Sequence, residues 1–286
     1  MTTLQLLTAL AIFILAGLRP FAFYPCAKRF SSKTSSAFTG VWLVIGILIT
    51  LPFFHDKLII NNQYFFHDPL TIVFGFIKGS LLWVIINYRQ TIRKESNSSS
   101  VYYCFISVAI GACINYFFFG AKLSSIQVVA IVAIGFLGLM FFLIGHANKL
   151  QKQTKIVFWL SVILLVITMV TDHNAISRTN WYVQFVIANI SFFLTSFISR
   201  TTKQEWKDAL FHKDSIRAGI VFLVGEIVIM SSLVTILPVS VALLCIRLST
   251  PVVMVISAIA LKEGKWYEQA AFGGLTLLAA LPLIFG

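Results

Sequence analysis

Charge is scarce in this chain of 286 residues. Charged side chains make up 11% of the sequence, against about 25% in an average soluble protein. Hydrophobic residues account for 58%, and the mean hydropathy is +0.90. A chain with so few charges cannot cover a large apolar core with a polar surface. The shortage therefore excludes a soluble protein and indicates a polytopic membrane protein.

Residues that carry catalysis or bind metals are also few. The four cysteines lie apart in apolar segments without a CxxC spacing, and the five histidines lie in loops or at segment ends. An enzyme needs clustered acids, histidines or a nucleophile with its base, and no such cluster is visible. No GxxxxGK[ST] motif is present, which argues against ATP-driven transport by this chain. We therefore expect no enzyme, no metal and no cofactor.

Long apolar segments are abundant. A bilayer core of about 30 Å requires about 20 helical residues. Runs of that size fall near 3–26, 35–55, 69–89, 99–119, 124–145, 155–172, 181–199, 215–236, 238–261 and 266–285. The sequence thus predicts an all-α polytopic membrane protein with ten transmembrane helices.

The net charge of +12 is distributed very unevenly among the predicted loops, and cytoplasmic loops are those that retain Lys and Arg. One set of alternate loops holds Lys28, Arg29, Lys33, Arg89, Arg93, Lys94, Lys149, Lys152, Lys155, Arg200, Lys203, Lys207, Lys213, Arg217, Lys262 and Lys265. The opposite set holds only Lys57, Lys122 and Arg178. We therefore expect an integral protein of a bacterial inner (plasma) membrane, with the N- and C-termini outside. The charge then needs no nucleic-acid partner.

The two halves of the chain share a pattern. Residues 101–142 can be laid over the segment that begins at Val241, and both contain a helix, a short polar break, a glutamine (Gln127 or Gln269) and a glycine-bearing helix. Halves 1–148 and 149–286 would each contain five helices. Because five is odd, the second half enters the membrane from the other side, so the sequence predicts two inverted five-helix repeats. Substrate sites of such repeats lie near the midplane, between the halves.

The C-terminal run LPVSVALLCIRLSTPVVMVISAIALKEGKWYEQAAFGGLTLLAALPLIFG resembles the C-terminal signature of EamA-type members of the drug/metabolite transporter superfamily. That signature has a mid-span proline, a short acidic break, a glutamine and a Gly-rich last helix, which stand here as Pro251, Glu263, Gln269 and Gly273–Gly274. The start, AIFILAGLRPFAFYPCAK, is similar to the family's first helix, with Gly17 and Lys28 matching. The resemblance implies a transporter with a five-plus-five helix layout.

Two features depart from the family pattern. The first half has Ala109 and Ala121 where the usual proline and acidic residue would stand. The charge distribution also predicts termini outside the cell, whereas family members commonly keep them in the cytoplasm. The resemblance therefore does not predict a transport direction.

Three basic residues, Arg19, Lys78 and Arg247, lie inside the predicted spans together with the acid Glu226. A charge at the bilayer centre costs at least about 2.5–3.5 kcal/mol and usually faces a cavity or a partner. Lys78 and Glu226 both fall near the midplane, on helices that are equivalent in the two halves. They could form a structural ion pair, or one or both could carry substrate or a proton.

Prolines accompany two of these charges. Pro251 lacks the N–H that would bond the carbonyl of Arg247, and Pro20 likewise frees the carbonyl of Ala16. A freed carbonyl is tolerated where a helix lines a cavity. Arg247 is therefore our first candidate for the site, whereas Arg19 could instead extend to the cytoplasmic interface.

Three basic groups against one acid predict a cavity for an anion, because guanidinium groups match carboxylate and phosphate. Neutral hydrogen bonds would come from Asn115, Tyr116 and Ser249. We expect a secondary active transporter of a small organic anion, or of a zwitterion with an acidic group, that works by alternating access. Glu226 is the candidate for a coupling proton.

Several alternatives stay open. The protein could export amino acids or amphipathic compounds, flip a lipid phosphate across the bilayer, or serve as a scaffold that transports nothing. Its expected partners are the small-molecule substrate, membrane lipids and the coupling proton, in a monomer or a homodimer.

Overall fold

The computed structural model describes residues 2–60, 63–120, 122–198, 203–237 and 239–285. The eleven α-helices of these ranges are α1 (Thr3–Arg29), α2 (Ser32–Phe54), α3 (Pro69–Glu95), α4 (Ser99–Phe119), α5 (Ser125–Leu143), α6 (Lys152–Arg178), α7 (Trp181–Ile198), α8 (Lys203–Phe211), α9 (Lys213–Thr235), α10 (Val239–Ala260) and α11 (Trp266–Phe285). A two-residue antiparallel pair, β1 (Ile59–Ile60) with β2 (Gln63–Tyr64), accompanies them. The all-α fold class is confirmed.

Short polar residues set where several helices begin. Thr2 and Gln5 form a capping box at α1, and Ser124 forms another with Gln127 at α5. Ser31 caps α2, and Asp68 caps α3 directly before Pro69 at its first position. These caps fix the first residue of each of these four helices, which begin close to the bounds predicted from the sequence.

The basic residues from Arg200 to Arg217, which the sequence assigns to one loop, surround a short helix, α8. Ala209 of this helix is fully buried, and Trp206 stacks on Phe197 of α7 with ring centroids 5.8 Å apart. The segment alternates charged and apolar residues at helical spacing, so it can pack one face on the protein and turn the other to water. Such a helix is too short to cross a membrane.

Five helical segments are long and apolar enough to cross a membrane: Thr3–Arg29, Ser32–Leu58, Pro69–Glu95, Ser125–Leu143 and Trp266–Phe285. Three shorter apolar segments, Ser99–Ile114, Trp181–Phe197 and Leu244–Ala260, accompany them in the described part of the chain. Many large apolar side chains on these segments point outward, as they do where lipid is the solvent. The protein is therefore membrane-embedded, while the count of ten spans stays a prediction.

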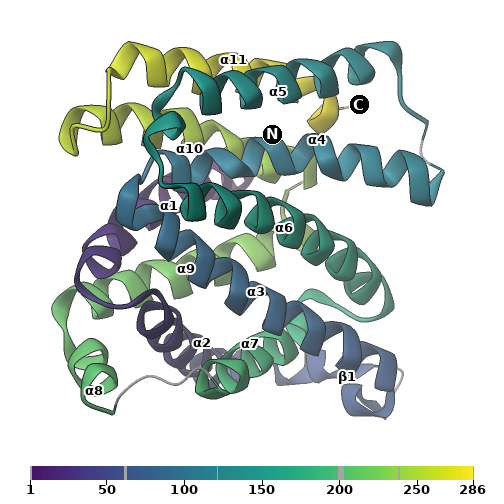
Figure 1. The fold of residues 1–286 in the computed structure, drawn as a ribbon. Coiled ribbons are helices and arrows are strands. Elements are labelled where there is room, and N and C mark those ends of the chain that lie inside the picture. Colours follow the sequence, from purple (N-terminus) through teal and green to yellow (C-terminus); the bar gives the residue numbers. More distant parts are fainter. Residues whose placement is uncertain (1, 61–62, 121, 199–202, 238, 286) are drawn as a thin grey trace.

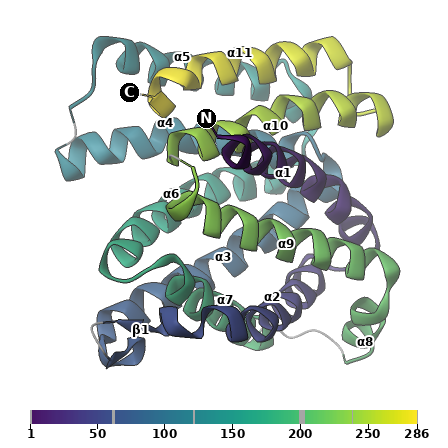
Figure 2. The same ribbon diagram turned by 180° about the vertical axis from the view of Figure 1, so that it is seen from behind.

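The helices lie across the view in stacked layers, with α5 and α11 on top and α2 and α7 at the bottom (Figures 1 and 2). Between these layers, α3 packs against α6 and α7, and α9 packs against α1 and α2. Helix α1 also contacts α10, and α4 contacts α6. Helices from 1–148 thus pack mainly against helices from 149–286, so the two halves form one interleaved unit.

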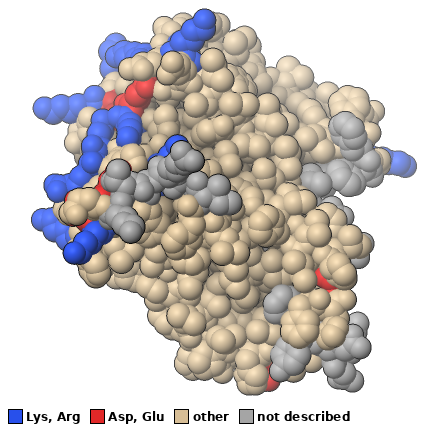
Figure 3. Space-filling model, turned by 60° about the horizontal axis from the view of Figure 1, so that its bottom comes forward, with Lys and Arg blue, Asp and Glu red and all other residues tan. Residues whose placement is uncertain are grey.

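Basic side chains gather at one end of the molecule. Helix α8 and the turn between α10 and α11 lie at the left of Figure 1, and β1 and the α4–α5 connection lie at the right. Figure 3 shows most of the visible Lys and Arg side chains along the same left edge. We call this the basic end. It is the end formed by the loops that the charge count assigns to the cytoplasm.

Three glutamates at the basic end each hold the start of a helix that is distant in sequence. Glu95 accepts a hydrogen bond at 2.8 Å from the backbone N–H of Gln151, which directly precedes α6. It accepts another from the hydroxyl of Thr154, in the first turn of α6. Glu205 accepts one from Ser31 N at α2, at 3.1 Å. Burial alone would raise the pKa of Glu205, but its hydrogen bonds to Ser31 and Thr34, together with the charge of Lys94, lower it overall. Carboxylates placed here neutralise the positive ends of helix dipoles.

The third glutamate, Glu263, ties the α10–α11 turn to the start of α4. It is buried and accepts hydrogen bonds from Asn97 N at 2.7 Å and from Ser98 N at 2.8 Å. The hydroxyls of Ser96 and Ser98 bond the same carboxylate. The serine-rich stretch 95–100, which reads as an ordinary polar loop, is therefore almost completely buried from Ser96 onward and anchored by this acid.

Candidate functional site

A cavity of about 340 Å³ lies between α1, α3, α4, α6, α9 and α10. Its volume falls in the range typical of small-molecule sites. The lining comes from both halves of the chain: Ala16, Arg19, Pro20, Lys78, Leu82, Arg89, Val101, Tyr103, Cys104, Leu165, Thr168, Glu226, Ile229, Ile246, Arg247, Ser249, Thr250 and Val253. Five of the predicted site residues, Arg19, Lys78, Glu226, Arg247 and Ser249, thus meet in one place.

Glu226 forms an ion pair with Arg19 inside this cavity. Arg19 Nη1 lies 2.9 Å from Glu226 Oε1, and Arg19 Nη2 donates to the Phe222 carbonyl at 3.2 Å. The two side chains are 17% and 18% exposed. Among the described residues this carboxylate pairs with Arg19 and not with Lys78. The sequence left an ion pair between Lys78 and Glu226 open as one alternative, but the carboxylate pairs with Arg19 instead, and Arg19 therefore does not extend to the interface.

Local packing explains the pairing. Helix α9 packs directly against α1, and the absence of a side chain at Gly225 leaves room for the guanidinium. A Cβ atom at Gly225 would lie 2.5 Å from Arg19 Nη2, so any other residue there would displace the Arg19 head group. The glycine next to Glu226 thus leaves the space that the Arg19 head group occupies in the ion pair.

Lys78 is buried, with 4% of its surface exposed, on the stretch of α3 that approaches α7 most closely. A Cβ atom at Gly79 would lie 2.1 Å from the Ala188 carbonyl oxygen, and one at Gly75 would lie 2.5 Å from the Ile187 side chain. The glycines at GxxxG spacing therefore let α3 pack on α7. With Gly75 and Gly79 packed on α7, the neighbouring face of α3, which carries Lys78, lines the cavity.

Arg247 is 4% exposed and lines the cavity from the middle of α10. Its guanidinium donates no hydrogen bond to any residue that the structure describes, and its Nε atom is fully buried. The proline one turn later faces elsewhere: Pro251 packs against α11, where a Cβ atom at Gly273 would lie 2.9 Å from Pro251 Cα. Helix α10 thus directs its charge into the cavity and its proline toward a neighbouring helix.

Arg89 and Arg93 were assigned to a cytoplasmic loop from the sequence, but the structure places both inside the helix bundle. Helix α3 continues to Glu95, and Arg89 follows Lys78 by eleven residues, which is about three helical turns and the same face. That spacing is the signal that could have identified Arg89. Its Cζ atom lies 5.1 Å from the centre of the Tyr103 ring, and it lines the cavity.

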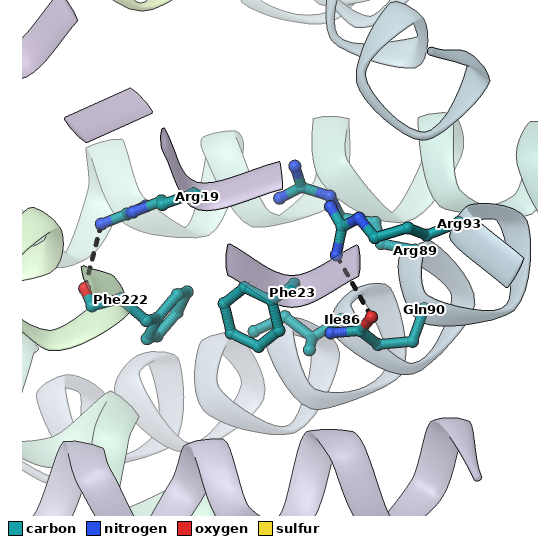
Figure 4. Close-up of a pocket in the computed structure, with 7 residues that line it drawn as sticks. All are labelled: Arg19, Phe23, Ile86, Arg89, Gln90, Arg93 and Phe222. Atoms are coloured by element: carbon teal, nitrogen blue, oxygen red, sulfur yellow. Dashed lines mark hydrogen bonds between the residues drawn. The ribbon is translucent and has the colours of Figure 1, made fainter. Parts of the chain in front are cut away.

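A second, small pocket of about 20 Å³ shares Arg19 and Arg89 with the cavity. It is lined by Arg19, Phe23, Ile86, Arg89, Gln90, Arg93 and Phe222 (Figure 4). The rings of Phe23 and Phe222 face each other edge to face, with centroids 5.8 Å apart. Arg93 donates to Gln90 Oε1 at 3.2 Å and to Asn97 Oδ1 at 3.1 Å. A space of this size holds about one water molecule.

Of the predicted site residues whose side chains the structure describes, Tyr116 does not join the cavity lining. Tyr116 is 48% exposed near the far end of α4, and its ring contacts that of Phe117. Its neighbour Asn115 has a side chain outside what the structure describes. The cavity lies instead beside the first turns of α4, so Tyr103 supplies the phenol that was expected from Tyr116.

Comparison with family models gave no match, and comparison with curated proteins gave no significant match. In the described part of the chain, no group of three His, Cys, Asp or Glu side chains is placed to hold a metal ion. What this cavity can do is therefore argued from its own residues. It presents four basic side chains and one acid on an otherwise mainly apolar wall.

Proposed function

We propose that the protein is a secondary active transporter of small organic anions that works by alternating access, and that it belongs with the EamA-type transporters. The observation that carries the proposal is the buried guanidinium of Arg247, which faces the cavity without a partner among the described residues. Burying a charge without a partner costs several kcal/mol. An anionic ligand would offset that cost, because it supplies the missing acceptors.

The packing of the helices supports ten spans in two inverted five-helix repeats, over 1–148 and 149–286. If α1 to α5 correspond in order to α6, α7, α9, α10 and α11, the α1–α9 contact corresponds to α6–α3. Likewise α1–α10 corresponds to α6–α4, and α2–α9 to α7–α3. All of these pairs are in contact. Helix α8 lies outside the correspondence, as a surface segment of the basic end.

The proposed mechanism is rocking of one five-helix half against the other around the cavity. In this mechanism the substrate would pass between the cavity and the basic end beside Phe23 and Phe222, which line the small pocket. Each of these rings carries an arginine over its face, Arg93 on Phe23 and Arg19 on Phe222. Movement of α1 against α9 would separate the rings and open the path.

Glu226 would couple this movement to a proton. A proton bound to Glu226 would cancel its charge and leave Arg19 without an anionic partner. Arg19 could then attract the substrate, and release of the proton would restore the ion pair. Arg247 and Lys78 would neutralise the substrate, and Ser249 would add a hydroxyl.

Uptake into proteoliposomes tests the proposed function. We expect the purified protein to accumulate radiolabelled organic anions, and an excess of unlabelled anion inside the vesicles to accelerate uptake, because alternating access exchanges substrate across the membrane. Empty liposomes and labelled amino acids or organic cations serve as controls. Uptake of amino acids or cations alone would favour the exporter, movement of a fluorescent phospholipid would favour the flippase, and no transport of any kind would favour the scaffold.

Cysteine labelling tests the narrow passage. Cys104 lines the cavity, so a variant with Cys26, Cys113 and Cys245 replaced by alanine reports access through one thiol. In oriented vesicles, Phe222→Ala is expected to raise the rate at which a charged methanethiosulfonate labels Cys104 from the basic end by about tenfold, equivalent to about 1.4 kcal/mol. The ring removed is one of the two that narrow the passage.

The matched control for this measurement is Phe211→Ala, at an exposed phenylalanine on α8 at the same end of the molecule. Its labelling rate should equal that of the parent. An unchanged rate in Phe222→Ala as well would show that the passage does not run between the two rings.

A further inference from the structure

The charges of the cavity do not balance within the described residues. Glu226 is the one acid of the lining, and it is engaged by Arg19 at 2.9 Å. Lys78, Arg89 and Arg247 remain, and neither of the two guanidinium groups forms an ion pair or a hydrogen bond in the part of the chain that the structure describes. Two guanidinium groups of one cavity therefore have no anion in contact, although Arg89 lies within electrostatic range of Glu226.

The two arginines approach the same side chain. Arg89 lies over the ring of Tyr103, with Cζ 5.1 Å from its centre. Both Arg89 and Arg247 lie within electrostatic range of the Tyr103 phenol, which is buried. Since Arg89 comes from α3, Tyr103 from α4 and Arg247 from α10, three helices bring these groups together. The phenol therefore lies near two positive charges.

We propose that the transported anion carries two negative charges, one bound by Arg247 and the other by Arg89. This inference rests on the proposed transport function and adds the charge class of its substrate. The phenol of Tyr103 would position the ligand by a hydrogen bond. Dicarboxylates and phosphate monoesters share this chemistry, because both present two negative charges that guanidinium groups bind in bidentate fashion.

The rest of the wall suits the carbon skeleton of such a molecule. Leu82 and Leu165 are among its apolar side chains, together with Ile229, Ile246 and Val253. These groups offer no acceptor or donor in their side chains. Charge bound by two guanidinium groups and apolar contact with the carbon skeleton would thus select a short dianion over a longer polar molecule.

Thermal stabilisation of the purified protein in detergent tests the charge class with probes that differ by one charge. The first pair is succinate and its monoamide succinamate, and the second is phenyl phosphate at mildly alkaline pH and phenyl sulfate. Within at least one pair, the dianion is expected to raise the melting temperature more than its monoanionic analogue. The pair that responds distinguishes a carboxylate substrate from a phosphate ester.

Arg89→Gln supplies the decisive comparison. It keeps hydrogen-bond donors but removes one positive charge, so the preference for the dianion should disappear while the monoanion still binds through Arg247. Arg89→Lys keeps the charge and should keep the preference. Lys152→Gln, at an exposed position of α6, is the matched control and should behave as the parent. The melting temperature of each variant without probe reports whether it folds.

Three outcomes would overturn the inference. A monoanion could stabilise the protein as much as its dianion, the preference could survive in Arg89→Gln, or no dianion could stabilise the protein at all. The first two would leave the proposed function intact if proteoliposomes still take up organic anions. Absence of both dianion binding and anion uptake would reject the two proposals together.

Discussion

Arg247→Ala is expected to lower anion uptake into proteoliposomes by about 100-fold or more, which corresponds to about 2.7 kcal/mol. The reason is that a bidentate contact between guanidinium and anion is lost in a cavity whose wall is mainly apolar. Arg247→Lys keeps the charge but not the fork geometry, so an intermediate loss of uptake is expected. Initial rates of labelled anion uptake, normalised to reconstituted protein, provide the measurement.

Removing the Arg247 charge should lower uptake but raise the stability of the substrate-free protein. Because Arg247 has no partner among the described residues, Arg247→Met removes a buried charge that nothing compensates. We expect the substrate-free protein to become more stable by about 1–3 kcal/mol, seen as a higher melting temperature in detergent. A residue that lowers stability yet is required for transport is the signature of a binding site.

Arg19→Met is the matched control in the same cavity. In the parent protein, the Glu226 carboxylate lies 2.9 Å from the Arg19 guanidinium. Arg19→Met leaves this carboxylate without its partner, so the free energy of unfolding is expected to fall by about 3–5 kcal/mol. If Arg247→Met destabilised the protein as Arg19→Met does, Arg247 would be a structural residue. Unchanged uptake in Arg247→Ala would remove it from the substrate site.

Glu263→Ala is expected to destabilise the protein by about 3–5 kcal/mol, the cost of stranding buried polar groups around a lost charge. Glu263 is 7% exposed, and its carboxylate accepts two backbone N–H groups and two serine hydroxyls at the start of α4. Without it, these donors stay buried and unpaired. Thermal melting in detergent measures the change, and the α3–α4 connection should become sensitive to protease.

Glu268→Ala tests whether position or charge matters at this end. Glu268 lies five residues later in the first turn of α11, where its nearest partner, Lys265, is 3.5 Å away and largely exposed. An exposed ion pair contributes about 0–1 kcal/mol, so this variant should melt close to the parent. Equal effects of the two substitutions would mean that Glu263 acts only through net charge and that its hydrogen bonds contribute little.

Most helices could be predicted from the sequence because the bilayer imposes a simple requirement. An apolar run of about 20 residues bounded by a polar cap forms a helix, since lipid offers no other partner for the backbone. The predicted helix bounds were wrong where the chain stays helical beyond the apolar run, as in α3, which continues to Glu95. The sequence also predicted no helix at α8, a short helix whose hydrophobic face packs on the protein itself and does not contact lipid.

The candidate site was predictable in part for a related reason. A charged residue inside an apolar run is conspicuous, which identified Arg19, Lys78, Glu226 and Arg247. Arg89 was missed because basic residues near the end of a span usually belong to the topology signal. Tyr116 was placed in the site by its polarity alone, and no sequence pattern indicates which face of α4 meets the cavity.

The sequence by itself determined three properties: that the protein is embedded in a membrane, which segments of the chain form its long helices, and which charges are removed from water. The cost of a charge in hydrocarbon makes these properties local. Only the tertiary structure decided which charges meet. Glu226 pairs with Arg19 because α9 packs on α1 with a glycine at 225, and Lys78 turns inward because Gly75 and Gly79 let α3 approach α7. Such pairings depend on how helices rotate and cross, which close packing between distant segments sets.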